Sequence, residues 1–225
     1  MKARIAVAIA ARTADEATRM ARKAYRLGGD LAEIRLDYLG RGESYEKIAK
    51  VDDIPLIATF RSKKRDSQQR KEKEFADNLI VAAEAGFNYV DIETETRNLN
   101  SVVNKIHRLG ARTIVSHHDF QKTPSIPELD NVLRVCRASD AWMPKIVTTV
   151  RRLEDNLRLL SFIQKASKDG GLVCFGMGKI GIQSRIFSPI YGASFTFASL
   201  DERPVAPGQI SVMRMRRIYD EMGYS

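Results

Sequence analysis

The stretch Leu31-Ala32-Glu33-Ile34-Arg35-Leu36-Asp37-Tyr38-Leu39 decides the fold class, because charged and apolar residues alternate along it. We interpret it as a strand. Strands of parallel sheets are normally apolar on both faces, so the face that carries the charges must line something. The stretch at 89–95 repeats the pattern with three acidic residues, Asp91, Glu93 and Glu95. Polar side chains at the carboxyl ends of strands are typical of barrel enzymes.

Strand-like and helical stretches alternate from one end of the chain to the other, which predicts a parallel α/β sheet. We expect strands near 4–10, 31–39, 55–61, 89–95, 113–120, 142–150, 172–178 and 194–200. We expect helices near 14–27, 72–85, 99–109, 127–138, 153–168 and 210–221. Eight such units in 225 residues predict one domain over 1–225, a (β/α)₈ TIM barrel. A doubly wound open sheet is the main alternative, but Ala8-Ile9-Ala10-Ala11-Arg12 lacks the glycine-rich loop expected after its first strand.

The composition points away from secreted, membrane and nucleic-acid-binding proteins. Cys136 and Cys174 lie far apart, which favours a reducing, cytoplasmic location, and no apolar run reaches the ~18 residues of a membrane span. The net charge of +9 permits nucleic-acid binding but equally suits a site for an anionic metabolite. The densest basic stretch, 61–73, also contains acidic residues and has no aromatic residue before Phe75. We therefore expect neither a nucleic-acid nor a membrane partner.

Lys145 and His118 are the candidate catalytic residues, because each lies in a short apolar run that reads as a buried strand. A buried ammonium is costly without a partner, so Lys145 either pairs with a carboxylate such as Glu93 or acts as a reactive amine. Burial and nearby arginines would lower its pKa and favour attack on a carbonyl. An amine and an imidazole on neighbouring strands suggest a Schiff-base enzyme with a proton carrier and no cofactor.

The two adjacent histidines should point in opposite directions. His118 ends its strand and should stand near the mouth of the barrel, one strand away from Lys145. His117 has the opposite strand parity and should face the helices. An isolated histidine is more often structural than catalytic, but the neighbouring lysine strand favours His118 as the group that takes and returns a proton.

Two arginines and one glutamine are candidate substrate ligands. Arg61 follows an apolar strand and Arg185 follows the seventh strand, although either could be a solvated loop arginine. Two arginines at one barrel mouth would suit a substrate carboxylate. Gln209 could lie over the site or simply begin the last helix. We expect no metal, because the cysteines lack zinc spacing and the histidines do not cluster; Asp91 and Glu93 could bind a cation, but orienting His118 or Lys145 is their simpler use.

Six motifs in order resemble type I 3-dehydroquinate dehydratase, the Schiff-base dehydratase of the shikimate pathway of aromatic amino-acid biosynthesis. They are Glu33-Ile34-Arg35-Leu36-Asp37, Ala58-Thr59-Phe60-Arg61-Ser62, Ser116 with His118-Asp119-Phe120 and Lys122-Thr123-Pro124, Lys145-Ile146, Met177-Gly178 with Ser184-Arg185, and Ala206-Pro207-Gly208-Gln209. Any one would be weak, but six in register over the whole chain are specific.

The resemblance implies a (β/α)₈ barrel in which Lys145 forms an imine with the C3 ketone of 3-dehydroquinate. It further implies that His118 removes the C2 proton, helps protonate the departing C1 hydroxyl and assists imine formation and hydrolysis, giving 3-dehydroshikimate and water. By family position, Arg185 binds the substrate carboxylate and Gln209 closes over it. The substrate oxygens would contact Glu33, Arg35 and Arg61. We also expect a homodimer.

The chain departs from the family pattern in two places. After Arg61-Ser62 it continues Lys63-Lys64-Arg65-Asp66 where an E-G-G segment usually supports the histidine, so we expect Glu93 or Asp91 to replace that support. Val205 stands where a small hydroxyl residue is common, which predicts an altered lid contact. Two other functions stay open: an aldolase or transaldolase type of Schiff-base barrel, which would favour a glycine-rich phosphate site, and a non-catalytic basic binding protein.

Overall fold

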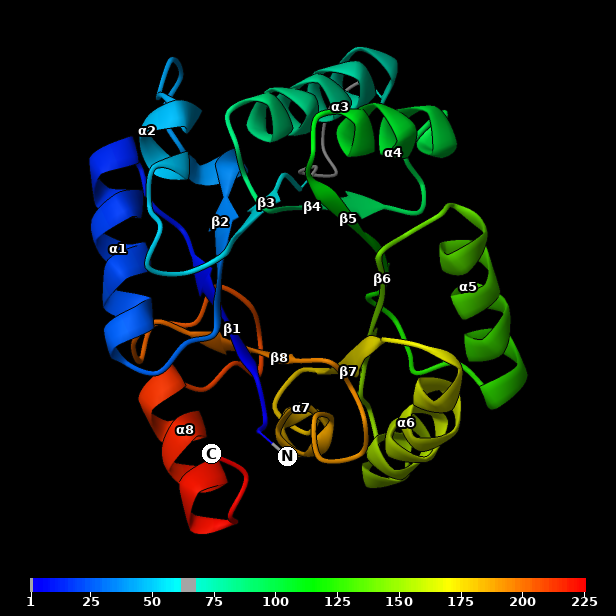
Figure 1. The fold of residues 1–225 in the computed structure, drawn as a ribbon. Helices are drawn as coiled ribbons and strands as arrows, with labels where there is room; N and C mark the ends of the chain where they lie inside the picture. The colour runs from blue at the N-terminus through cyan, green and yellow to red at the C-terminus, as the bar shows by residue number, and fades with distance from the viewer. Residues whose placement is uncertain (1, 62–67) are drawn as a thin grey trace.

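The computed structural model describes residues 2–61 and 68–225, and its strands form a central ring enclosed by helices (Figure 1). The strands are β1 (Ile5–Ile9), β2 (Leu31–Arg35), β3 (Leu56–Thr59), β4 (Tyr89–Glu93), β5 (Arg112–Asp119), β6 (Met143–Thr149), β7 (Val173–Met177) and β8 (Thr196–Ser199). The helices are α1 (Ala14–Arg26), α2 (Tyr45–Ala49), α3 (Gln68–Glu84), α4 (Leu99–Arg108), α5 (Ile126–Ala138), α6 (Leu153–Ala166), α7 (Ile182–Phe187) and α8 (Val212–Glu221).

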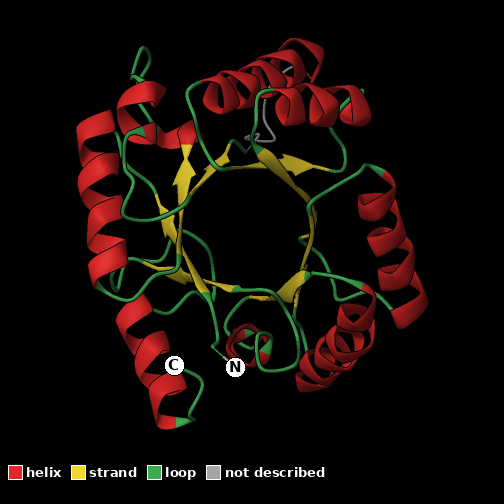
Figure 2. Ribbon diagram, in the orientation of Figure 1, coloured by secondary structure: helices red, strands yellow, loops and turns green. Residues whose placement is uncertain are grey.

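The eight strands form one parallel sheet that curls into a near-closed barrel (Figure 2). Their hydrogen-bonded order is β7-β6-β5-β4-β3-β2-β1-β8, so β1 pairs with both β2 and β8. The two strands at the ends of this order, β7 and β8, contact each other across the seam. The predicted (β/α)₈ barrel is therefore confirmed.

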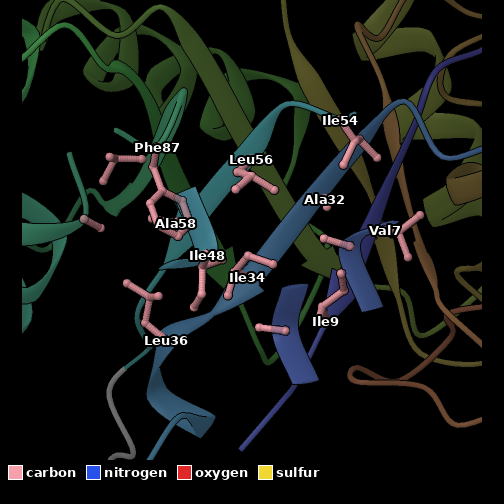
Figure 3. Close-up of a cluster of buried hydrophobic side chains, with 14 of the residues drawn as sticks. Val7, Ile9, Ala32, Ile34, Leu36, Ile48, Ile54, Leu56, Ala58 and Phe87 are labelled. Atoms are coloured by element: carbon pink, nitrogen blue, oxygen red, sulfur yellow. The ribbon is translucent and has the colours of Figure 1, made fainter. Parts of the chain in front are cut away.

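Strand residues divide by parity between the inside of the barrel and the layer beneath the helices. Val7, Ile9, Ala32 and Ile34 belong to a buried cluster on the outer side, which also receives Ile48 of α2 (Figure 3). The interior set is separate and consists of Ala6, Leu31, Ile57, Ile114, Met143, Val147, Val173, Phe175, Phe195 and Phe197. Both strand faces are thus largely apolar, and the charged residues of the site lie toward the carboxyl ends.

All the predicted strands except the one at 113–120 are longer than the observed strands, and for two of them a contact explains the earlier end. The strand expected at 31–39 ends at Arg35, and a 3₁₀ helix at Leu36–Tyr38 follows it. The Arg35 guanidinium folds back onto the Asp37 carboxylate with distances of 2.9 and 2.7 Å, which stabilises this turn. The strand expected at 89–95 ends at Glu93, whose carbonyl accepts a turn hydrogen bond from the Thr96 amide at 3.0 Å. Asp37 and Glu95 therefore do not lie on strand faces.

The helices differ from the prediction in number and at some boundaries, since α3 begins at Gln68 rather than at 72. The short helices α2 and α7 were not predicted, and the closing helix begins at Val212 rather than at 210. Gly28 and Gly110 follow their helices with φ of 90° and 88°, a left-handed conformation that glycine adopts without strain. Within the described ranges, no helix is long and apolar enough to cross a membrane.

Candidate active site

Lys145 projects from β6 into the barrel and is 4% exposed. Its Nζ lies 2.7 Å from Oδ2 of Asp91 and 3.5 Å from Oε1 of Glu33. It also lies 4.1 Å from the centroid of the Phe197 ring. The two carboxylates compensate for the burial of the ammonium, which would otherwise be strongly destabilising. Lys145 is therefore held at a defined position inside the barrel, and does not reach out to solvent.

Asp91 connects Lys145 to a second cation. Its Oδ1 accepts hydrogen bonds from Nη2 of Arg61 at 2.8 Å and from Oγ of Ser116 at 2.6 Å, while Oδ2 faces Lys145. Burial raises the pKa of this carboxyl, but Arg61 and Lys145 together outweigh burial and bring the pKa well below its usual range. Asp91 is thus an ionised counter-ion shared by both cations.

Arg61 belongs to this charged cluster and is not a solvated loop arginine. Besides Asp91, its guanidinium contacts the Ser116 hydroxyl at 3.2 Å and Oε1 of Glu93 at 3.4 Å, both through Nη1. The guanidinium is 16% exposed. The structure does not describe Ser62 to Asp66. These residues include the last position of the expected T-x-R-S motif and the segment that departs from E-G-G. The expectations that rest on that segment stay predictions.

His118 lies one inward position above Ser116 on β5, and Ser116 is the register partner of Lys145. The His118 side chain is 13% exposed, and its Nδ1 lies 4.0 Å from Oε1 of Glu93, too far for a hydrogen bond. In the described part of the chain this buried nitrogen has no hydrogen-bond partner. Burial, Arg61 and Lys145 lower the pKa of His118 well below its usual range. The imidazole is therefore neutral at neutral pH and able to accept a proton.

His117 points the other way, toward the turn after β4. Its Nδ1 lies 3.0 Å from Oε1 of Glu95 and 3.3 Å from Oγ1 of Thr94. The hydrogen bond to Glu95 raises the pKa of His117, so the two neighbouring imidazoles are shifted in opposite directions. Strand parity thus separates them, as the alternation of a strand requires.

Glu33 and Arg35 occupy successive inward positions of β2. Oε1 of Glu33 accepts a hydrogen bond from Oγ1 of Thr59 at 3.0 Å and faces Lys145, so Glu33 belongs to the same cluster. Arg35 instead directs its fork at Asp37 and lies over the Tyr38 ring, 5.0 Å from its centroid. Nε and Nη2 of Arg35 therefore already donate hydrogen bonds to the Asp37 carboxylate.

Arg185 is the most deeply buried arginine of the site, at 1% exposure, and α7 carries it. Its guanidinium donates to backbone carbonyls, those of Phe197 at 3.4 Å and of Gly176 and Pro207 at 3.5 Å. In the described structure its Nε has no partner. Burial lowers the pKa of Arg185 to about 9, with only partial compensation from Glu33. A bound anion would therefore stabilise this buried cation.

Two phenylalanine rings place Arg185 and Lys145 on one apolar floor. Phe175 and Phe197 contact each other with ring centroids 5.8 Å apart. Cζ of Arg185 lies 4.3 Å from the Phe175 centroid, and Lys145 lies over Phe197. Neither ring was expected at the site from the sequence, and Ser116 was noted only as part of a motif, although period-two counting along the strands could have found all three.

The side-chain carbonyl of Gln209 does not contact the charged residues around Lys145 that the structure describes. Its Oε1 accepts hydrogen bonds from the backbone amides of Val205 at 2.9 Å and Ala206 at 3.0 Å, so it stabilises its own loop. The loop is anchored on β7 through the Gly178 amide, which donates to the Pro207 carbonyl at 3.3 Å. Gly208 has a φ of 78°, and a Cβ at this position would clash with the Gly178 backbone, so no other residue fits there without a shift.

Within residues 2–61 and 68–225, no group of three or more histidine, cysteine, aspartate or glutamate side chains is arranged to hold a metal ion. The polar groups at the carboxyl ends of the strands are instead cations and carboxylates in direct contact. An apolar floor, a buried amine and a neutral imidazole beside them define a (β/α)₈-barrel enzyme with its site at the usual end of the barrel.

Comparison with known proteins makes this assignment specific. The family model described as type I 3-dehydroquinase matches residues 5–225. The chain belongs to the type I 3-dehydroquinase family and is an enzyme of the hydro-lyase class.

Relatives and solved structures agree with the family assignment. A 3-dehydroquinate dehydratase of Dehalococcoides mccartyi is 38% identical over 88% of this chain and 88% of its own length. That of Methanosarcina barkeri is 32% identical over 95% of this chain and 93% of its own length. The crystal structure of the Clostridium difficile type I enzyme with covalently modified comenic acid has a TM-score of 0.83 at 25% identity, covering 100% of this chain and 93% of that one.

Proposed function

We propose that this enzyme dehydrates 3-dehydroquinate to 3-dehydroshikimate in the shikimate pathway, through an imine between Lys145 and the substrate. The observation that carries the proposal is a buried lysine on a barrel strand, with a neutral and largely buried histidine on the neighbouring strand. The relatives named above, at 38% and 32% identity, are 3-dehydroquinate dehydratases.

The chemistry follows from the positions of these two groups. The Lys145 amine, after losing a proton, attacks the C3 ketone, and loss of water from the adduct gives an iminium that acidifies the C2 hydrogen. His118, being neutral, takes the C2 proton and then gives it to the C1 hydroxyl as this leaves as water. Hydrolysis of the product imine restores the Lys145 amine.

We further propose that the two carboxylates of β4, Asp91 and Glu93, have different tasks. Asp91 holds Lys145 at 2.7 Å and keeps its charge compensated before reaction. Glu93 approaches Nδ1 of His118 to 4.0 Å and is the better candidate for orienting the imidazole. Burial raises the pKa of Glu93, as do the neighbouring Asp91 and Glu95 carboxylates, against the opposing effect of Arg61. Glu93 would thus take the role of the E-G-G glutamate that supports the histidine in the family and that this chain lacks.

The alternative of a phosphate-binding aldolase finds no support in the glycines of β7. The amide of Gly176 donates to Oγ of Ser184 at 3.0 Å, and the amide of Gly178 donates to the Pro207 carbonyl. A phosphate site built from backbone would need these amides. The buried Arg185 guanidinium suits a carboxylate better, because it can form paired hydrogen bonds with both oxygens.

Borohydride reduction in the presence of 3-dehydroquinate tests the proposed imine. We expect a stable ligand adduct on Lys145, located by peptide mass spectrometry, and progressive loss of turnover as the adduct forms. Omitting the substrate is the control, since reduction then has no imine to trap. Full turnover without an adduct, or an adduct on another lysine only, would contradict the proposal.

Arg185→Lys tests carboxylate binding. We expect KM to rise about 10- to 100-fold with a smaller change in kcat, because an ammonium loses the paired hydrogen bonds, each worth ~1.5–3 kcal/mol when charged. Steady-state kinetics with 3-dehydroquinate measure both constants. The matched control is Arg216→Lys, since Arg216 is also poorly exposed and donates to the Gly28 and Ala3 carbonyls near the N-terminal ends of the strands. An unchanged KM for Arg185→Lys would remove Arg185 from the proposed site.

A further inference from the structure

The imidazole of His118 is stacked against a phenylalanine at the barrel mouth. The Phe120 ring lies with its centroid 5.9 Å from that of His118 and is inclined to it by 15°. Phe120 is nevertheless 57% exposed, so burial of its own surface explains little of its position. A large apolar side chain kept at the mouth and nearly parallel to the proposed catalytic ring suggests a role toward that ring.

The backbone around Phe120 is held firmly. Oδ1 of Asp119 accepts hydrogen bonds from the amides of Gln121 at 2.7 Å and Lys122 at 2.9 Å, which closes a tight turn around Phe120. The Asp119 carbonyl accepts a further bond from Oγ1 of Thr149 at 3.0 Å, which joins the turn to the end of β6. The ring is therefore presented to His118 by a turn tied to the strand that carries Lys145.

We propose that Phe120 is a positioning residue that fixes the plane of the His118 imidazole during proton transfer. This inference rests on the proposed function, in which one imidazole takes a proton from C2 and then donates it to the hydroxyl that leaves from the adjacent C1. The ring must then reach two proton positions in succession. An aromatic face confines the ring to a plane and still permits it to slide and turn within that plane.

The hydrogen-bonding of His118 supports this assignment. A close acceptor at Nδ1 would fix the direction of the ring as well as its plane, but Oε1 of Glu93 stands 4.0 Å away. In the part of the chain that the structure describes, no other side chain bonds to this nitrogen. The Phe120 stack thus restrains the tilt of the ring, while Glu93 acts on it only electrostatically.

The test compares Phe120→Leu, Phe120→Ala and Phe120→Tyr. Leucine keeps much of the apolar volume but no flat face, whereas tyrosine keeps the face and extends its hydroxyl toward solvent. We expect kcat to fall about tenfold for leucine and alanine, part of the 10²–10⁴-fold that a positioned general base contributes, and to stay within about twofold for tyrosine. KM should change less than kcat in all three. Tyr25→Ala, which removes another exposed aromatic ring on α1, is the control and should leave kcat unchanged.

Borohydride trapping of each variant separates this inference from the proposed function. The leucine and alanine variants should still give the Lys145 adduct, because the imine does not depend on Phe120. Trapping in the parent enzyme together with full kcat in Phe120→Leu, or equal losses for leucine and tyrosine, would overturn the positioning role alone. An adduct absent from the parent enzyme would instead overturn the proposed mechanism.

Discussion

Replacing Lys145 with alanine is expected to lower kcat by at least about 10⁵-fold and to abolish the borohydride adduct. The covalent route gains its rate from an amine held beside the reacting carbonyl, and effective molarities of this order are typical of well-oriented groups. Alanine also leaves Asp91 and Glu33 without their shared cation, since Nζ lies 2.7 and 3.5 Å from them. Part of any instability of this variant would therefore be electrostatic.

Lys145→Arg separates the two effects. A guanidinium keeps the positive charge beside Asp91 but forms no imine at neutral pH, because it is effectively always protonated. We expect Lys145→Arg to be as inactive as Lys145→Ala but to unfold at a higher temperature than Lys145→Ala. Lys165→Ala, at an exposed position of α6, is the control and should retain both activity and trapping. Turnover that survives Lys145→Ala would rule out the lysine mechanism.

His118→Ala is expected to lower kcat by about 10²–10⁴-fold, the range of a lost general acid or base. Imine formation should persist in part, so the borohydride adduct on Lys145 should accumulate without dehydration. His117→Ala should be milder, because its imidazole faces Glu95 and Thr94 rather than Lys145. Rapid-quench measurement of adduct and product distinguishes the two steps. Equal and nearly complete losses from both changes would show that strand parity does not separate the roles of the two histidines.

The pH dependence of the parent enzyme provides a second readout for His118. Its neutral form is the base, and burial, Arg61 and Lys145 lower its pKa below the ordinary value of 6.5. Protonation of this group therefore begins only as the pH falls below that value. We expect kcat/KM to persist below pH 6.5 and to decline at more acidic pH. An acid limb at or above pH 6.5 would contradict a buried, neutral His118.

Much of the barrel could be predicted from local pattern, and its errors have local causes. Alternation along β2 marks Glu33 as inward-facing, but it does not reveal that Arg35 folds onto Asp37 and ends the strand. The short helix α7 was missed because its six residues carry too little periodicity to recognise. Arg185 was therefore expected after the seventh strand without any indication that a helix buries it.

The candidate site shows the same division. Parity along β5 correctly distinguishes the directions of His117 and His118, because a strand alternates whatever surrounds it. The partner of Lys145 could not be chosen from the sequence: both Glu93 and Asp91 were suggested, and the structure pairs Lys145 with Asp91, 54 positions away along the chain. The contacts of Gln209 could not be predicted from its motif either, since its side-chain carbonyl accepts hydrogen bonds from the amides of its own loop.

The amino-acid sequence by itself determined the eight-unit barrel, the inward direction of Lys145 and His118, and membership of the family through its ordered motifs. These depend on hydrophobic period and on short segments, which local chemistry specifies. Only the tertiary structure decided that Asp91 bridges Lys145 and Arg61, that Arg185 is buried against backbone carbonyls, and that Phe120 stacks on His118. Such contacts arise when curling of the sheet brings distant strands together, and burial then sets the charge that each group carries.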